Sequence, residues 1–275
     1  KSDTKLKIRL IHNTSENFTV FQNNFINFNK NCEVQLEDHF NLTNNSINNI
    51  NYNIHIDESA VVKHSIFQNF ANSNKLYLTS NSVCEKNSFY NQNTYNFSDG
   101  FVRNFHHAHL NGEYSNASLK GCFFLKNQNI CSNKTNIIHN AENCVSDQTY
   151  KGILNDHSKA SYYSNTFVSE NAQKTQGYQL SKGILLTDNC SFFSKPELRI
   201  FADDVKCSHG STIGPVDESA LYYLRSRGIS KNEAMKMIIS SFIEEDLQNL
   251  DKNIAERVSK NLGNSYTKIN PLAKI

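Results

Sequence analysis

A cysteine and a histidine lie two residues apart in the segment VKCSHG, as Cys207 and His209. Residues at positions i and i+2 of an extended strand face the same side, so a strand here brings the thiol and the imidazole together. A thiolate beside an imidazole suits iron, copper or zinc. Two ligands do not close a metal site, so we expect further ligands from elsewhere in the chain or from a partner. From the spacing alone, the alternative is the end of a surface strand where a cysteine and a histidine occur together without binding a metal.

A second cluster, FHHAH, contains His106, His107 and His109. His107 and His109 have the spacing to share a strand face and hold a metal. In a chain with 10 histidines, solvent-facing side chains are the simpler interpretation. The adjacent carboxylates Asp203 and Asp204 would point to opposite sides of a strand, which argues against shared acid–base work. No phosphate-binding loop, dinucleotide fingerprint, zinc-protease or serine-hydrolase motif is present.

The chain has 7 cysteines, an odd number, with no CxxC pair and no visible export signal. These features argue against a disulfide framework. We expect the six cysteines other than Cys207 to be small buried side chains.

Short β-type runs separated by turn residues fill the chain from Lys1 to Gly214. The clearest runs are Ile8–Ile11, Phe18–Phe21, Val34–Leu36, Ala60–Val62, Leu76–Leu78, Cys122–Leu125, Thr166–Val168 and Gly183–Leu186. A loose repeat recurs, in which a turn residue precedes a small or polar residue and then an apolar strand, as at Asn17, Asn31 and Asn143. This recurrence favours a parallel β-solenoid over a sandwich or a barrel.

The chain contains 41 asparagines, interleaved with apolar residues rather than run together. One interpretation is a fold with many turns, because Asn tolerates the left-handed region and bonds its own backbone. Drift in an AT-rich genome is the other, and the composition does not separate the two.

The pattern becomes helical after Pro215. Asp217 predicts the start of a helix that stops at Gly228, and Ser230-Lys-Asn-Glu233 is a capping box for a second helix. A third apolar stripe runs from Leu247 to Leu262. We therefore expect a β core over residues 1–215 and a C-terminal helical domain over residues 216–275.

The composition excludes some functional classes. Hydrophobic residues make up 38% and charged residues 20%, which is not the balance of a charged disordered chain. The formal net charge of +2 is too small to indicate a protein that binds nucleic acid through its overall charge. No apolar run approaches the ~18 residues of a membrane span, and the first residues lack the apolar segment of a secretory signal.

Two segments carry a resemblance to a known family. Residues 194–214 read SKPELRIFADDVKCSHGSTIG, and residues 216–228 read VDESALYYLRSRG. Supporting stretches upstream are Phe101–Asn104, Thr149–Leu154, Ala172–Thr175 and Ser181–Leu186. This part of the chain resembles the SufB/SufD family of iron–sulfur cluster assembly scaffold proteins. SufD-type members are favoured, since SufB-type proteins carry a different segment here.

The resemblance implies a mainly β fold, a right-handed parallel β-helix with a C-terminal α-helical domain. It implies a non-catalytic scaffold subunit that pairs with SufB through the β-helix cores and receives the ATPase SufC on its C-terminal helices. A homodimer is the alternative in isolation. In the family motif, the histidine at His209 sits at the SufB interface and is implicated in building the nascent cluster, and Cys207 matches the same motif. The iron–sulfur cluster would be transient and shared with SufB, with none bound stably by the isolated chain.

Tyr222, Arg225, Met235 and Met237 are the residues we expect to contact the ATPase, because methionine and aromatic side chains adapt well to such grooves. Capping the end of the solenoid is the alternative role for them.

The expected compartment is a bacterial cytoplasm, with the plastid stroma as the alternative. Rival functions are a β-solenoid carbohydrate-active enzyme, which needs clustered acidic groups that do not repeat here, and a purely structural solenoid.

Overall fold

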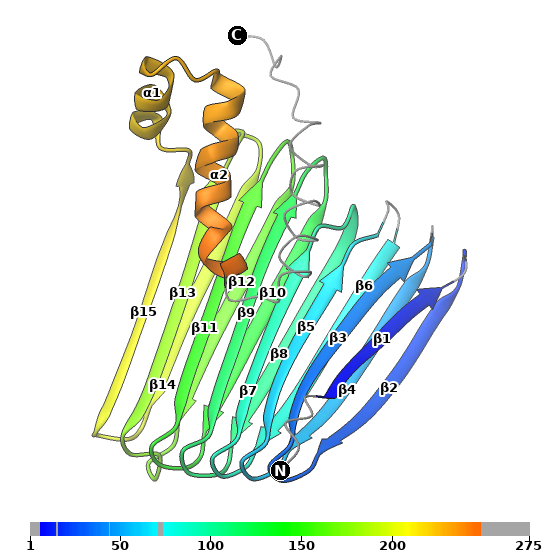
Figure 1. The fold of residues 1–275 in the computed structure, drawn as a ribbon, viewed down its shortest axis with the longest axis vertical. Helices are drawn as coiled ribbons and strands as arrows, with labels where there is room; N and C mark the ends of the chain where they lie inside the picture. Colours follow the sequence, from blue (N-terminus) through cyan, green and yellow to red (C-terminus); the bar gives the residue numbers. More distant parts are fainter. Residues whose placement is uncertain (1–5, 15, 44, 71–73, 249–275) are drawn as a thin grey trace.

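The computed structural model describes residues 6–14, 16–43, 45–70 and 74–248. In these residues the strands all precede the helices (Figure 1). The strands are β1 (Leu6–Thr14), β2 (Thr19–Phe28), β3 (Glu33–Leu42), β4 (Ile47–Ile56), β5 (Val61–Gln68), β6 (Asn74–Cys84), β7 (Phe89–Asn96), β8 (Gly100–Leu110), β9 (Asn116–Leu125), β10 (Ile130–His139), β11 (Val145–Leu154), β12 (Lys159–Val168), β13 (Thr175–Leu185), β14 (Ser191–Ile200) and β15 (Val205–Pro215). The helices are α1 (Glu218–Ser226) and α2 (Lys231–Gln248).

The strands form two parallel sheets that wind as one solenoid (Figure 1). The odd-numbered strands make an 8-stranded sheet and the even-numbered strands a 7-stranded sheet. Each strand pairs in parallel with the strand two positions along the chain, as Leu6 with Val34 and Ile130 with Lys159. Two strands therefore make one coil, and each coil stacks on the next. The predicted parallel β-solenoid is confirmed, and the apolar runs identified in the sequence lie in its strands except for one end residue each at Phe18, Ala60 and Leu186.

Strict alternation of side chains makes the core. In β10, Cys131, Asn133, Thr135, Ile137 and His139 are buried, and the residues between them face outward. Such alternation is the pattern of a strand with one face on a core. One apolar cluster runs through the interior from Phe28 to Phe192.

Asparagines occupy many of the turns between strands. Six of them have φ between 56° and 61°, namely Asn17, Asn31, Asn45, Asn87, Asn127 and Asn143. Asparagine adopts this left-handed conformation at less cost than most side chains because its short amide bonds the local backbone. At these positions the turn interpretation of the asparagine content is confirmed.

All seven cysteines are free thiols. Cys84, Cys122, Cys131, Cys144 and Cys190 are buried, as expected. Cys32 is an exception, because it follows the αL turn residue Asn31 at the rim of the solenoid and is only half-buried.

The two helices begin where the sequence predicts. The Asp217 carboxylate accepts a hydrogen bond from the backbone N–H of Ser219 at 2.9 Å and caps α1. Gly228 ends this segment with φ of 85°. Ser230 and Glu233 bond each other reciprocally and open α2. The predicted third helix, from Leu247 onward, lies almost entirely outside the described residues.

Helix α2 packs on the outer face of the 8-stranded sheet rather than on the end of the solenoid. Ile239 and Ile243 are buried in a cluster with Phe124 and Ile153 of β9 and β11. Lys151 reaches from β11 to donate a hydrogen bond to the carbonyl of Phe242 at 3.2 Å. Neither described helix combines the length and apolar character needed to cross a bilayer.

Candidate functional site at the end of the solenoid

Cys207 and His209 lie on β15, the last strand of the 8-stranded sheet. Cys207 is opposite Gly177 and His209 is opposite Gln179 in the register with β13. Gly177 and Gln179 are buried and face the interior. Because opposed residues in a sheet share a side, Cys207 and His209 both face inward, on one side of their strand as the spacing predicts.

The coil that carries this pair is the last one in the described solenoid. Strands β3 to β13 each carry several buried residues, whereas β15 has no buried residue at all. No further described coil stacks on this end. His209 is therefore exposed and Cys207 half-buried, although both face inward.

Cys207 has an apolar surrounding, in contact with the small cluster of Val168, Ala172 and Ala202. Burial raises the pKa of its thiol, and a backbone hydrogen bond at Gly177 opposes this rise only in part. The thiol therefore stays protonated near neutral pH. Metal binding by this sulfur would require the thiol to lose its proton, so any such affinity would depend on pH.

The described residues contain no group of three or more His, Cys, Asp or Glu side chains arranged to hold a metal ion. Cys207 and His209 supply at most two donors at an open end of the fold. A tetrahedral iron or zinc site needs about four ligands. This arrangement can contribute to a site whose remaining ligands come from outside the described residues.

The interior directly beneath His209 is polar. Gln148, Gln179 and His209 occupy the same register position on three successive strands of the sheet. The two glutamine side chains both donate to the hydroxyl of Thr166, at 2.8 Å and 2.7 Å. Ser164 donates to Gln179 at 3.0 Å. Sequence reasoning missed this layer, although polar residues at inward positions of the alternating pattern were a visible signal.

The structure separates the histidines of the FHHAH segment. His107 and His109 face outward together on β8, as their spacing predicts. His106 faces the interior and is fully buried, 3.1 Å from the hydroxyl of Ser80. The expectation of solvent-facing side chains is wrong for His106, because adjacent strand residues alternate sides. Burial lowers the pKa of His106 to about 3.

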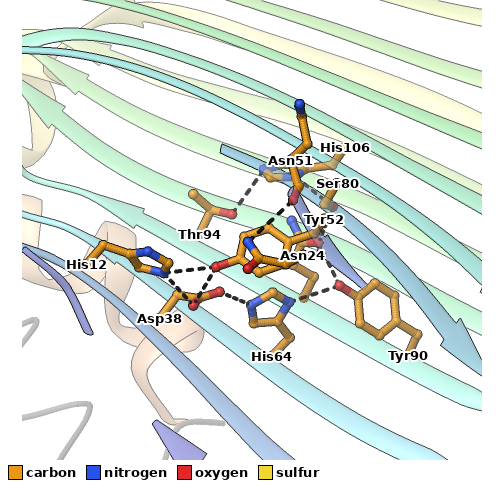
Figure 2. Close-up of polar contacts among 11 residues, drawn as sticks. His12, Asn24, Asp38, Asn51, Tyr52, His64, Ser80, Tyr90, Thr94 and His106 are labelled. Atoms are coloured by element: carbon orange, nitrogen blue, oxygen red, sulfur yellow. Dashed lines mark hydrogen bonds and ion pairs between the residues drawn. The ribbon is translucent and has the colours of Figure 1, made fainter. Parts of the chain in front are cut away.

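A buried carboxylate forms the centre of a second polar group near the other end of the solenoid (Figure 2). Asp38 accepts a hydrogen bond from the hydroxyl of Tyr52 at 2.8 Å. His12 Nε2 lies 3.1 Å from the same carboxylate, and His64 Nε2 lies 2.6 Å from its other oxygen. Burial alone would raise the pKa of Asp38, but the hydrogen bonds from His12 and His64 hold it well below its usual range. Asp38 is therefore ionised inside the core.

Hydrogen bonds continue from this carboxylate along the solenoid axis (Figure 2). His64 Nδ1 lies 3.0 Å from the hydroxyl of Tyr90, which donates to Gln92 at 2.8 Å. Ser80 donates to the same Gln92 oxygen at 3.0 Å and also contacts His106. Sequence reasoning did not find this chain, because its members come from different coils and share no local motif.

The helical residues expected to bind a partner differ in their exposure. Tyr222 is 76% and Met237 50% exposed, and Arg225 is also exposed. Met235 instead packs, half-buried, against the apolar cluster between α2 and the sheet.

The fold and this end define a β-solenoid scaffold protein with an open edge that carries a cysteine and a histidine. The chain belongs to the SufBD family, because the domain described as "SUF system FeS cluster assembly, SufBD core domain" matches residues 10–242. It is 36% identical to the iron–sulfur cluster assembly protein SufD of Escherichia coli over 155 residues, which is 56% of this chain and 37% of that protein. It is 39% identical over 105 residues to the chloroplastic protein ABCI7 of Arabidopsis thaliana, covering 38% of this chain and 22% of that protein.

A cyanobacterial member of the same family, from Synechocystis, is 32% identical over 126 residues, or 46% of this chain and 28% of that protein. The matches thus span well under half the length of these curated relatives. The Escherichia coli and Synechocystis relatives are both named as iron–sulfur cluster assembly proteins. The predicted family is confirmed.

Proposed function

We propose that this chain acts as a SufD-type scaffold subunit of the SUF machinery and carries out no catalysis itself. Its membership of the SufBD family is the observation that carries this proposal. The nascent iron–sulfur cluster is the cargo of such a subunit. A bacterial cytoplasm or a plastid stroma is the compartment we infer, since relatives include a bacterial and a chloroplastic protein.

The last coil is the surface that we assign to SufB. Both β14 and β15 have an unpaired edge in the described residues, and such an edge accepts strands from another chain. Cys207 and His209 sit at this edge and lack the further ligands that a cluster needs. SufB then completes the coordination, with His209 as the principal contact of this chain and Cys207 as the second. A homodimer through the same edge is the form we expect when SufB is absent.

The helical pair is the surface that we assign to the ATPase SufC. Tyr222, Arg225 and Met237 offer an aromatic ring, a cation and a flexible apolar side chain to a partner. Met235 takes a different part in this proposal, since its contact with the solenoid anchors α2 beneath the docking surface.

Anaerobic reconstitution tests the role of the Cys–His pair. The full chain, as wild type or with His209→Ala, is co-expressed with SufB and SufC, and iron and sulfide are measured in the purified complex. We expect His209→Ala to lower cluster content at least severalfold while the complex stays assembled. His157→Ala, at an exposed histidine in the turn between β11 and β12, is the matched control. Unchanged cluster content in His209→Ala would support a purely structural solenoid instead.

Substitutions in α1 test the docking surface. We expect Tyr222→Ser with Arg225→Glu to abolish co-purification of SufC and to leave the melting temperature of the chain unchanged. Tyr114→Ser, at a tyrosine 56% exposed in the turn between β8 and β9, is the control for loss of a surface ring. If the α1 variant unfolds the chain, the helices are a structural cap and this assignment fails. If it binds SufC normally, the ATPase docks elsewhere.

A further inference from the structure

The outer face of the 7-stranded sheet carries an excess of positive charge, which one carboxylate, Glu197, offsets only in part. Strands β8, β10, β12 and β14 place Arg103, Lys134, Lys159 and Lys195 outward and exposed. None of these four cations pairs with a carboxylate in the described residues. The single outward carboxylate of these strands, Glu197, already binds Arg199 at 2.7 Å.

The opposite sheet pairs some of its outward cations with carboxylates. On its outer face, Lys7 and Arg9 both pair with Glu37, at 2.6 Å and 2.9 Å. Lys120 pairs with Asp147 at 2.7 Å. That face also carries α2, whereas no described helix packs on the 7-stranded sheet. Lys63, Lys182 and Lys206 on that face have no carboxylate partner among the described residues either, so what sets the 7-stranded sheet apart is that its unpaired cations lie on a face that no described helix covers.

Apolar side chains lie between the free cations. Phe193 is 56%, Tyr163 39% and Ile130 43% exposed. Tyr163 stands in register between Lys134 and Lys195 on the two neighbouring strands. An exposed apolar centre with cations around it is the composition of a protein–protein contact, in which aromatic anchors and charge complementarity act together.

The arrangement of the rings distinguishes a protein ligand from a single-stranded nucleic acid. Nucleic-acid bases stack on aromatic rings whose flat faces are free. Here Lys134 Nζ covers the Phe105 ring at 4.6 Å from its centroid, and His107 packs on the same ring at 4.0 Å. The rings of Tyr163 and Phe193 pack in a tilted arrangement with their centroids 5.7 Å apart. The cation and the imidazole on the Phe105 ring occupy face that a stacked base would need, which favours a protein ligand.

We propose that this surface, formed by Arg103, Lys134, Lys159, Tyr163, Phe193 and Lys195 and named here the basic face, binds a protein partner through an acidic surface with apolar side chains at its centre. The basic face lies on the side of the solenoid, apart from the inward Cys–His pair and from the helices. Phe193 and Lys195 lie on β14, whose free edge is assigned to SufB above, but their side chains face outward from the sheet, so the test below uses the chain without SufB.

Fluorescence anisotropy of the full chain with a labelled peptide of repeating Glu-Glu-Leu units tests the proposal. We expect binding that weakens as salt rises, and a loss of about tenfold or more in Lys134→Glu with Lys195→Glu. Lys63→Glu with Lys182→Glu changes the net charge equally on the other sheet and should leave affinity nearly unchanged. Phe193→Ser should also weaken binding severalfold, because the partner needs the apolar centre.

Four results would overturn the proposal. They are no binding of the peptide by the wild type, equal losses in the two double variants, unchanged affinity in Phe193→Ser, and tighter binding of oligouridylate than of the peptide with the same residue dependence. The last result would identify the basic face as a nucleic-acid surface. All these substitutions are at outward positions, so circular dichroism and thermal melting are expected to match the wild type.

Discussion

His64 Nε2 lies 2.6 Å from the carboxylate of Asp38, and both side chains are fully buried in the solenoid. An ionised carboxylate in a protein core is stable only while its charge and its lone pairs are satisfied. Here two imidazoles and the hydroxyl of Tyr52 supply those bonds. The polar core near β1 to β5 therefore depends on a few specific partners rather than on apolar contact.

Replacing the buried carboxylate should destabilise this part of the solenoid. We expect Asp38→Asn to lower the free energy of unfolding by about 3 kcal/mol, because it removes the negative charge and puts an NH2 donor in place of one of the two oxygens that face His12 and His64. Urea unfolding followed by circular dichroism measures the change. Asp147→Asn, which breaks only the surface pair with Lys120, should cost under about 1 kcal/mol. Equal effects of the two substitutions would contradict the importance assigned to the buried group.

Buried histidines should make the protein sensitive to acid. Burial lowers the pKa of His106 to about 3 and that of His139 to about 4, from 6.5. Below pH 6.5 these histidines bind protons in the unfolded chain but not in the folded chain. The stability present above pH 6.5 is therefore lost as the pH falls toward the pKa values of the folded state, about 4 and 3. Each histidine contributes a slope of about 1.4 kcal/mol per pH unit in this range.

The variant His106→Gln removes one of the groups that bind a proton in the unfolded chain but not in the folded chain. We expect its unfolding free energy to depend less steeply on pH between about 6 and 4 than that of the wild type. His157→Gln, at an exposed histidine, is the control and should change the slope less than His106→Gln does. Urea titrations at a series of pH values compare the slopes, and identical slopes in His106→Gln and the wild type would show that His106 is protonated in the fold.

The left-handed turns should tolerate glycine and reject β-branched residues. Asn127 has φ of 56° in the turn between β9 and β10. We expect Asn127→Gly to be nearly neutral and Asn127→Val to destabilise by about 1–2 kcal/mol. Gln128→Val, at the next exposed residue, is the control and should have a small effect in thermal melting. A harmless Asn127→Val would mean that this turn relaxes to another conformation.

Replacing one glycine in the core by a larger residue should destabilise the fold, because a neighbouring side chain fills the space. A Cβ at Gly121 would overlap the buried ring of Tyr150 on the next coil. We expect Gly121→Ala to destabilise by about 1–3 kcal/mol, because a well-packed core accepts extra volume poorly. Gly214→Ala adds the same methyl group where no atom lies within 4 Å and is the control. Similar melting temperatures for both variants would be inconsistent with tight packing at Gly121.

Local features of this fold were predictable because their physics is local. The cap at Asp217, the stop at Gly228 and the turn at Asn31 follow from side-chain and backbone preferences within a few residues. The shared side of Cys207 and His209 likewise follows from strand geometry alone. That β15 is the terminal described strand, with its inner side uncovered, depends on coil stacking that a short motif does not encode.

The sequence pattern did not predict which side chains of different coils contact one another. Asp38 and His64 are 26 residues apart and share no motif. Their contact depends on the number of residues in the intervening coil, which sets the register of the stacked strands. The place of α2 on the side of the sheet was missed for the same reason, because an apolar stripe predicts burial and does not identify the surface that provides it.

The terminal coil is held from one side only, which has a consequence for its dynamics. In a stack where each unit contacts only its neighbours, the end units open most readily and the middle ones last. Amide hydrogens of β14 and β15 should therefore exchange with solvent faster than those of β9 to β12. The proposed assembly edge lies on the most easily frayed part of the solenoid. A protein that docks there adds the missing neighbour and slows that exchange, so part of its binding free energy goes into ordering the end of this chain.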